Sequence, residues 1–199
     1  MTLTQMLGQK LVFGFHGTSL SPEFKALIRK YKIGNVILFL RNVESANQLR
    51  RLCDEIRTLI LEETGYPPFI IIDQEGGMVS RLPKDAVNVP GAMALAATGN
   101  PENARLASEI TVRQLKGLGA NFNMAPVLDV NSNANNPCAA LGMTRRLWPP
   151  LAAPLWRPTR AAAFCAAPSI FLATETRQWT ATWGFPAWTR PSRSWKRWS

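Results

Sequence analysis

Two carboxylates and an arginine lie close together in the stretch DQEGGMVSR, residues 73–81. Asp73 comes directly after three isoleucines, and a pair of glycines follows Glu75. A carboxylate at the end of a buried strand can accept hydrogen bonds from sugar hydroxyls, and the glycines allow a sharp turn and the close approach of a ligand. Arg81 could pair with Asp73 or Glu75, or bind a ligand oxygen. The spacing alone leaves a second interpretation open, an acidic turn at a strand end with an ordinary salt bridge.

The segments around this stretch alternate between strands and helices. Apolar runs typical of strands cover residues 10–15, 33–42, 68–72 and 120–130, and amphipathic patterns typical of helices cover residues 21–31, 45–65 and 100–119. Strands that are apolar throughout are covered on both faces, so the alternation predicts an α/β fold with a parallel sheet, either doubly wound or a (β/α)8 barrel. In both architectures functional residues gather at the carboxyl ends of the strands. The polar residues predicted to lie there are His16, Arg41, Asn42, Asp73 to Glu75, and Asp129.

The helix boundaries also leave signals. Ser21 and Asn100 are predicted to be the N-caps of the first and third helices. Gly65 is predicted to end the second helix, and Gly117 or Gly119 to end the third. Four strand–helix units in the first two thirds of the chain amount to half of a typical barrel of roughly 250 residues.

Three motifs, in the same order and with fitting spacing, carry a resemblance to a known family. IIIDQEGGMVSRLP, residues 70–83, closely resembles the xDQEGGRVxRL signature of family 3 glycoside hydrolases, on the β-N-acetylhexosaminidase branch. GNVILFLRN (34–42) resembles the second-strand motif of that family, and NFNMAPVLDVNSNANNP (121–137) resembles its segment around the fourth strand. The resemblance covers about residues 3–137. One departure is Met78, where the family commonly has arginine.

The resemblance implies a (β/α)8 TIM-type barrel, truncated here to about its first half, and the release of terminal β-linked N-acetylglucosamine from oligosaccharides or cell-wall muropeptides with retention. Carried over by position, Asp73 and Arg81 resemble residues that hold the sugar. Glu75 and Asp129 are possible further contacts, and Asp129 resembles a structural carboxylate at the next strand end. The family resemblance implies no cofactor and no metal.

The catalytic residues that the resemblance implies are absent from this sequence. A retaining enzyme needs a nucleophile and an acid/base about 5 Å apart. On this branch the nucleophile is an aspartate late in the barrel, and the acid/base is a histidine in a loop of the type KHFPGHGDT…DSH. The sole histidine is His16, which lies too early and is predicted to be a strand-end or core residue. The chain is therefore predicted to be inactive, and a non-catalytic sugar-binding remnant is the alternative.

The composition changes abruptly near Pro137. Residues 1–137 carry 14 Lys and Arg against 12 Asp and Glu, whereas residues 138–199 carry nine against one, which gives net charges of +2 and +8. The second segment holds all seven tryptophans and no valine. We therefore expect two parts, an amino-terminal half-barrel at 1–137 and an aberrant basic tail at 138–199 that is disordered or irregular.

A shifted reading frame explains this tail. SIFLATETRQWTATWGFP, residues 169–186, has a back-translation that, regrouped after its first two bases, encodes HFPGHGDTAVDSHMGL. The same shift turns AALGMTRR (139–146) into RSFGDDPE. Both products resemble the family's own continuation after NNP. The tail is therefore interpreted as family 3 coding sequence translated out of frame from about Cys138 onward.

Nucleic-acid binding through the basic, tryptophan-rich tail is the rival interpretation. It fits the charge and the aromatic residues but not the hidden motif, so the predicted partner is a small carbohydrate and not nucleic acid. Three cysteines at unrelated spacings indicate free thiols in a reducing compartment. With no signal-peptide pattern at the start and no run of 18 apolar residues, the expected location is cytoplasmic, away from the membrane.

Overall fold

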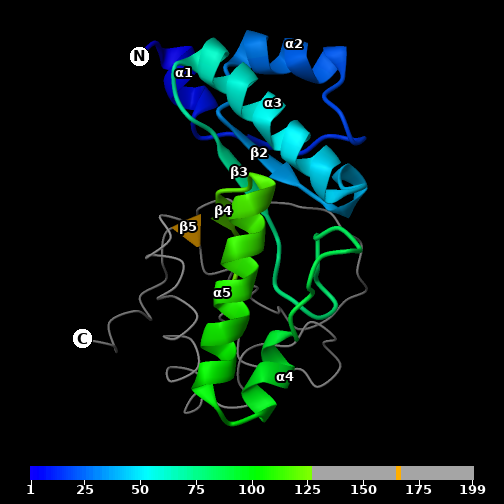
Figure 1. The fold of residues 1–199 in the computed structure, drawn as a ribbon. Helices are drawn as coiled ribbons and strands as arrows, with labels where there is room; N and C mark the ends of the chain where they lie inside the picture. The colour runs from blue at the N-terminus through cyan, green and yellow to red at the C-terminus, as the bar shows by residue number, and fades with distance from the viewer. Residues whose placement is uncertain (127–164, 167–199) are drawn as a thin grey trace, which may run out of the picture.

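Parallel strands form the centre of the molecule in the computed structural model, which describes residues 1–126 and 165–166 (Figure 1). Within these residues five strands make one sheet in the order β1-β2-β3-β4-β5, and every neighbouring pair is parallel. The strands are β1 (Val12–Phe13), β2 (Asn35–Leu38), β3 (Phe69–Ile72), β4 (Phe122–Asn123) and β5 (Cys165–Ala166). The helices are α1 (Leu3–Gly8), α2 (Pro22–Tyr31), the 3-10 turn η1 (Leu40–Asn42), α3 (Ala46–Thr64), α4 (Ala92–Ala97) and α5 (Pro101–Leu118). The predicted α/β fold with a parallel sheet is confirmed.

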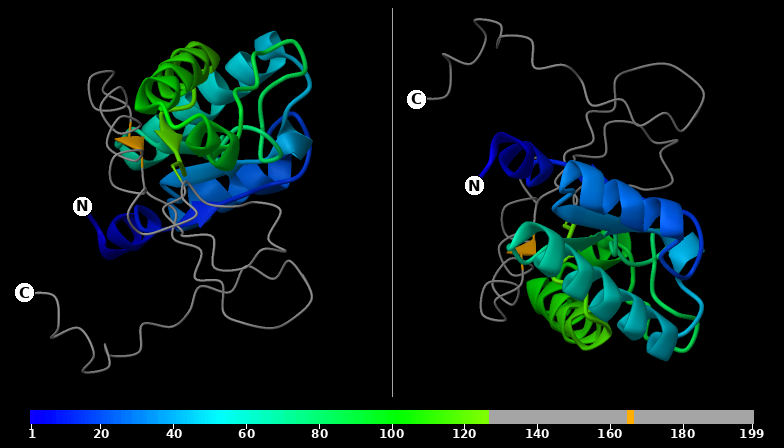
Figure 2. Two further views of the ribbon diagram at one scale, coloured as in Figure 1. Left: turned by 90° about the horizontal axis from the view of Figure 1, so that it is seen from below. Right: turned by 90° about the horizontal axis from the view of Figure 1, so that it is seen from above.

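Helix α3 packs between α2 and α5, and Figure 2 shows the three helices in that order in its right-hand view. Their inward faces and the strands share one core cluster, whose fully buried members include Ile28, Val36, Ile56, Ile60, Ile70, Ile72 and Leu115. Burying an aliphatic side chain of this size contributes roughly 1.5–3 kcal/mol. The strands are therefore packed against three helices through one shared core.

The predicted helix boundaries agree with the structure. The side-chain oxygens of Ser21 and Asn100 accept a backbone N–H from the first turn of α2 and α5, at 3.2 and 3.0 Å. Gly65 and Gly119 follow α3 and α5 in the left-handed region, with φ of 78° and 93°. Two helices that the sequence patterns did not predict, α1 and α4, are each six residues long.

The strands are shorter than the apolar runs that predicted them. The run 33–42 gives a strand that ends at Leu38, because a hydrogen bond to the side chain of Asn42 folds the residues that follow Leu38 into η1. The buried Asn42 side chain accepts the N–H of Phe39 at 2.9 Å and donates to the carbonyl of Phe15 at 3.1 Å. Side-chain hydrogen bonds of this kind compete with the strand ladder, and hydropathy does not report them.

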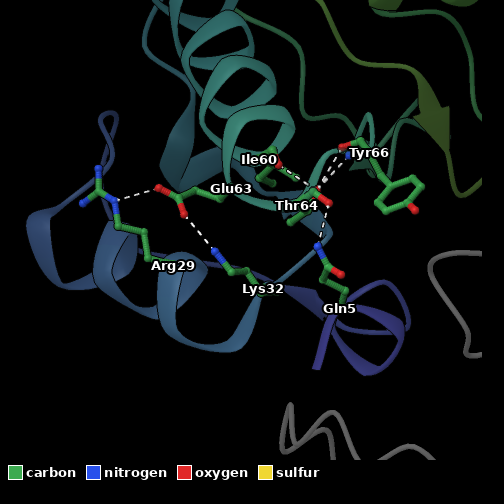
Figure 3. A network of polar contacts seen from close by, with 7 residues as sticks. All are labelled: Gln5, Arg29, Lys32, Ile60, Glu63, Thr64 and Tyr66. Carbon is green, nitrogen blue, oxygen red and sulfur yellow. Dashed lines mark hydrogen bonds and ion pairs between the residues drawn. The ribbon is translucent and has the colours of Figure 1, made fainter. Parts of the chain in front are cut away.

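A polar network joins α1, α2 and α3 at the amino-terminal end of the sheet (Figure 3). Glu63 of α3 accepts hydrogen bonds from Arg29 Nε at 3.1 Å and from Lys32 Nζ at 3.0 Å. The next residue, Thr64, is buried and its carbonyl accepts a hydrogen bond from Gln5 Nε2 of α1 at 3.4 Å. These bonds hold three helices in register at the end of the molecule opposite the strand ends.

Strand β5 is the described part of the segment 138–199. Cys165 and Ala166 pair with Phe122 and Asn123 of β4. The other residues of the predicted tail, and the predicted boundary at residue 137, lie outside the described residues. Among the described residues, no helix has the length and apolar character needed to cross a membrane.

Candidate functional site at the carboxyl end of strand β3

Asp73 lies where the sequence predicts it, as the first residue after β3. The three isoleucines that lead to it are buried, and β3 is paired on both sides, with β2 and with β4. Its carboxyl group is half-buried at the edge of the sheet where all the parallel strands end. An acidic side chain is thus fixed by a rigid central strand at the place where α/β sheets bind ligands.

Two opposing effects act on the Asp73 carboxyl group. Partial burial raises its pKa above the ordinary value, and the positive charge of Arg81 works against that rise. The net direction is upward, because desolvation of the charged form outweighs the attraction to Arg81. Asp73 is therefore a carboxylate kept partly out of water with a cation nearby, an arrangement suited to accepting hydrogen bonds from a polar ligand.

The glycine pair shapes the loop after Asp73. Gly76 and Gly77 have φ of 90° and 58°. A Cβ atom on Gly76 would lie 2.8 Å from the carbonyl oxygen of Pro90 and 2.9 Å from that of Val89. The N–H of Gly77 donates to the Val89 carbonyl at 2.8 Å. Both the backbone conformation and the close approach of residues 89–91 therefore require glycine here.

Gln74 was predicted to lie at the strand end, but sequence reasoning gave it no role in this loop. Its side chain is 1% exposed, and its Oε1 accepts the N–H of Arg81 at 2.7 Å and the hydroxyl of Ser80 at 3.1 Å. Its backbone N–H and carbonyl bond to the Asn123 side chain at 2.9 and 3.0 Å. Gln74 therefore ties the loop both to itself and to β4.

Arg81 lies near Asp73, as the sequence suggested, but makes no ion pair with it within the part of the chain that the structure describes. Its Nη1 donates to the carbonyl of Ser80 at 3.4 Å. Its Nε is buried, and no partner is found for it among the described residues. The arginine therefore has donors to spare at the strand end.

The other predicted site residues have different positions. Glu75 is half-buried in the turn, and its backbone N–H donates to the Val79 carbonyl at 3.0 Å. His16 was predicted to be a strand-end or core residue; it is exposed in the loop just after β1, so the strand-end alternative is correct and the core alternative is wrong. Met78 is 76% exposed at the tip of the turn. Asp129 lies outside the described residues.

The strand end next to Asp73, after β2, is also polar. Arg41 Nε donates to the Phe15 carbonyl at 3.0 Å, and its guanidinium lies 4.3 Å from the centre of the Phe39 ring. The amide of Asn42 is fully buried and bonds to the carbonyls of Phe15 and Gly17. These contacts fix the loop after β1 to the end of β2, which makes Asn42 a structural residue of the rim.

The family model described as "Glycosyl hydrolase family 3 N terminal domain" matches residues 2–143. The chain belongs to glycosyl hydrolase family 3. The resemblance drawn from the DQEGG motif is thereby confirmed, and the matched range includes β3 and the whole loop from Asp73 to Arg81.

Relatives of the chain are named beta-hexosaminidases or beta-N-acetylglucosaminidases. Beta-hexosaminidase A of Pseudoalteromonas piscicida is 38% identical, over 69% of this chain and 26% of its own length. Beta-hexosaminidase of Alkalilimnicola ehrlichii is 39% identical, over 63% of this chain and 36% of its own length. The solved family 3 beta-N-acetylglucosaminidase from Paenibacillus sp. str. FPU-7 aligns with a TM-score of 0.77 at 37% identity, over 83% of this chain and 32% of that chain. The chain thus spans about a quarter to a third of the length of these relatives.

Two other kinds of site, a cysteine nucleophile and a metal centre, are not supported by the residues that the structure describes. Cys53 is a free, buried thiol whose pKa is raised to about 12, chiefly by burial, so it is unsuited to act as a nucleophile. Among the residues that the structure describes, no three His, Cys, Asp or Glu side chains are grouped so as to hold a metal ion. The strand end around Asp73 is therefore the candidate site.

Proposed function

We propose that this chain derives from a family 3 enzyme that hydrolyses terminal β-linked N-acetylglucosamine with retention, and that Asp73 and Arg81 belong to the part of its pocket that holds the sugar. The observation that carries the proposal is the half-buried Asp73 at the end of the central strand β3, with Arg81 close enough to influence its pKa. The names of the relatives supply the sugar. Glu75 in the adjoining turn and Asp129 are further candidates for contact.

The 199-residue chain itself is proposed to be inactive. Retaining hydrolysis needs a nucleophile and an acid/base, and the single histidine, His16, is exposed in the loop after β1. No residue proposed here can take either role. Hydrolysis is therefore proposed for the family enzyme and not for this 199-residue chain. A cytoplasmic location stays a prediction from cysteine usage.

Residues 138–199 are proposed to be the out-of-frame product of a family 3 gene. The support is the motif HFPGHGDTAVDSHMGL hidden behind residues 169–186. The nucleotide sequence of these codons tests it, because the synonymous codons are fixed in the gene and not chosen by us. We expect the frame two bases over to read this motif without a stop codon. A frame that spells another sequence would refute the proposal.

A non-catalytic sugar-binding remnant is the second candidate, favoured by the retention of Asp73 and Arg81. Calorimetric titration of the chain with N-acetylglucosamine tests it, and we expect weak binding, because half of the pocket is missing. Asp73→Ala should weaken binding roughly tenfold to a hundredfold, since a hydrogen bond to a charged group is worth about 1.5–3 kcal/mol. The exposed Asp85→Ala is the matched control. Equal affinity of the chain and its Asp73→Ala variant would show that Asp73 does not bind the sugar.

A further inference from the structure

We propose that Gln74 is a positioning residue, which places Arg81 beside Asp73 by holding the backbone on which the arginine is mounted. The inference rests on the proposed function, because it assumes that Asp73 and Arg81 form the sugar-holding pair. Its geometrical basis is the 2.7 Å hydrogen bond from the N–H of the half-buried Arg81 to Oε1 of the buried Gln74.

The guanidinium of Arg81 is poorly anchored by its own contacts. Its one side-chain hydrogen bond among the described residues is the 3.4 Å bond from Nη1 to the Ser80 carbonyl, and Nε has no partner there. Where the head of a long side chain is held so loosely, its position follows from the backbone that carries it. That backbone is held at Arg81 by Oε1 of Gln74, which also accepts a hydrogen bond from the side-chain hydroxyl of Ser80.

Gln74 is in turn fixed to the sheet through its backbone. The amide of Asn123, at the end of β4, accepts the backbone N–H of Gln74 at 2.9 Å and donates to its carbonyl at 3.0 Å. Asn88 completes the arrangement, because it accepts from Gln74 Nε2 at 3.4 Å and donates to the Gly77 carbonyl at 2.9 Å. The position of Arg81 is thus set by β3 and β4, through the side chain of Gln74.

Glutamine suits this role for a chemical reason. The amide oxygen is a strong acceptor with no charge at any pH, so it holds two donors without disturbing the adjacent Asp73 carboxylate. A methionine of similar shape would keep the volume and remove the acceptor. A glutamate would keep the acceptor but would place a second negative charge next to Asp73, which makes it a poor control.

A double-mutant cycle on the pKa of Asp73 tests the inference without any sugar. The carboxyl signal of Asp73, assigned by its loss in Asp73→Asn, is titrated by NMR in the chain, in Gln74→Met, in Arg81→Met and in the double variant. We expect the pKa of Asp73 to rise in each single variant, because Arg81 no longer offsets the effect of burial. We expect no further rise when Gln74→Met is added to Arg81→Met. An unchanged pKa in a folded Gln74→Met chain, or an equal rise in both backgrounds, would overturn the proposal.

Two further measurements keep the outcome clear. Ser80→Ala removes one donor to Gln74 but leaves the Arg81 N–H bond, so it should leave the pKa of Asp73 unchanged. If Gln74→Met does not fold, amide exchange in the unmodified chain decides, since the Arg81 N–H must be protected and free exchange would refute its hydrogen bond. The pKa titration and the amide exchange use no sugar, so they can be interpreted even if the calorimetric titration shows no binding. The proposal on Gln74 and the proposal on sugar binding can therefore fail separately.

Discussion

Asp73 combines two properties that favour ligand binding over stability. It directly follows β3, which is paired on both sides, and its carboxyl group is kept partly out of water with Arg81 as the nearby cation. Desolvation of a charge costs folding free energy, and sites that bind polar ligands commonly carry such costs. The stability of the folded chain should therefore respond to this one carboxylate.

The raised pKa of Asp73 predicts the sign of that response. As pH rises through the ordinary aspartate range, the unfolded chain loses its proton first, so folding is penalised above that range and not below it. Asp73→Asn should therefore stabilise the chain at neutral pH, and the gain should vanish once the pH is below the ordinary pKa of aspartate. Urea unfolding at neutral pH and at a pH below the ordinary pKa of aspartate measures the difference in stability, with the exposed Asp85→Asn as the control. A variant that is less stable at neutral pH would contradict the assigned direction of the shift.

Gly76 predicts a second effect at the residue scale. Gly76→Ala should destabilise the chain by roughly 2–3 kcal/mol, because alanine must adopt a left-handed φ and its Cβ meets two carbonyl oxygens. Gly117→Ala is the matched control: the site is inside α5 with open space around it, and alanine should stabilise that helix by about 0.5 kcal/mol. Denaturant unfolding compares the two, and equal effects would show that the turn tolerates a side chain.

Sequence patterns locate this site only in part. Asp73, Arg81 and the glycine pair could be named in advance because they stand in the stretch DQEGGMVSR directly after an apolar run, and the family resemblance assigned Asp73 and Arg81 to the sugar. The roles of Gln74 and Asn123 could not be predicted, because an uncharged amide gives no such signal until its partners are known. Their roles come from reciprocal hydrogen bonds between residues 49 positions apart in the chain.

At the scale of elements, helices were easier to predict than strands. The long helices α2, α3 and α5 have clear caps and periodicity, whereas α1 and α4 are too short for a period to show. The capping box formed by Thr2 and Gln5 was the available signal for α1. Strand lengths were overestimated where a side chain such as Asn42 ends the ladder.

Glu63 carries a prediction about how α2 and α3 are joined. Its pKa is lowered, chiefly by the hydrogen bond from Lys32, with Arg29 adding to the effect. A lowered pKa means that the stabilisation is present above the ordinary glutamate pKa and is lost as pH falls through the folded value. Glu63→Gln should therefore destabilise the chain at neutral pH but not in acid, and added salt should shrink the difference. Thermal unfolding across pH measures it, with the exposed neighbour Glu62→Gln as control; a loss that persists in acid would point to packing.

At the scale of the whole molecule, residues 3–123 form a series of alternating helices and parallel strands within the range that the family 3 domain matches. The chain spans about a quarter to a third of the length of the relatives named above. The pairing of β4 with β5 could not be predicted, because Cys165 and Ala166 lie in a segment whose composition gave no strand pattern.

Hydrolysis of an aryl β-N-acetylglucosaminide tests the central claim most directly. The purified 199-residue chain is assayed beside the product of the same gene with its frame restored at codon 138, and beside that product with the histidines of its HFPGHGDT loop replaced by alanine. We predict turnover by the frame-restored product, and no turnover above the blank by the 199-residue chain or the histidine variant. Turnover by the 199-residue chain, or none by the frame-restored product, would contradict the account.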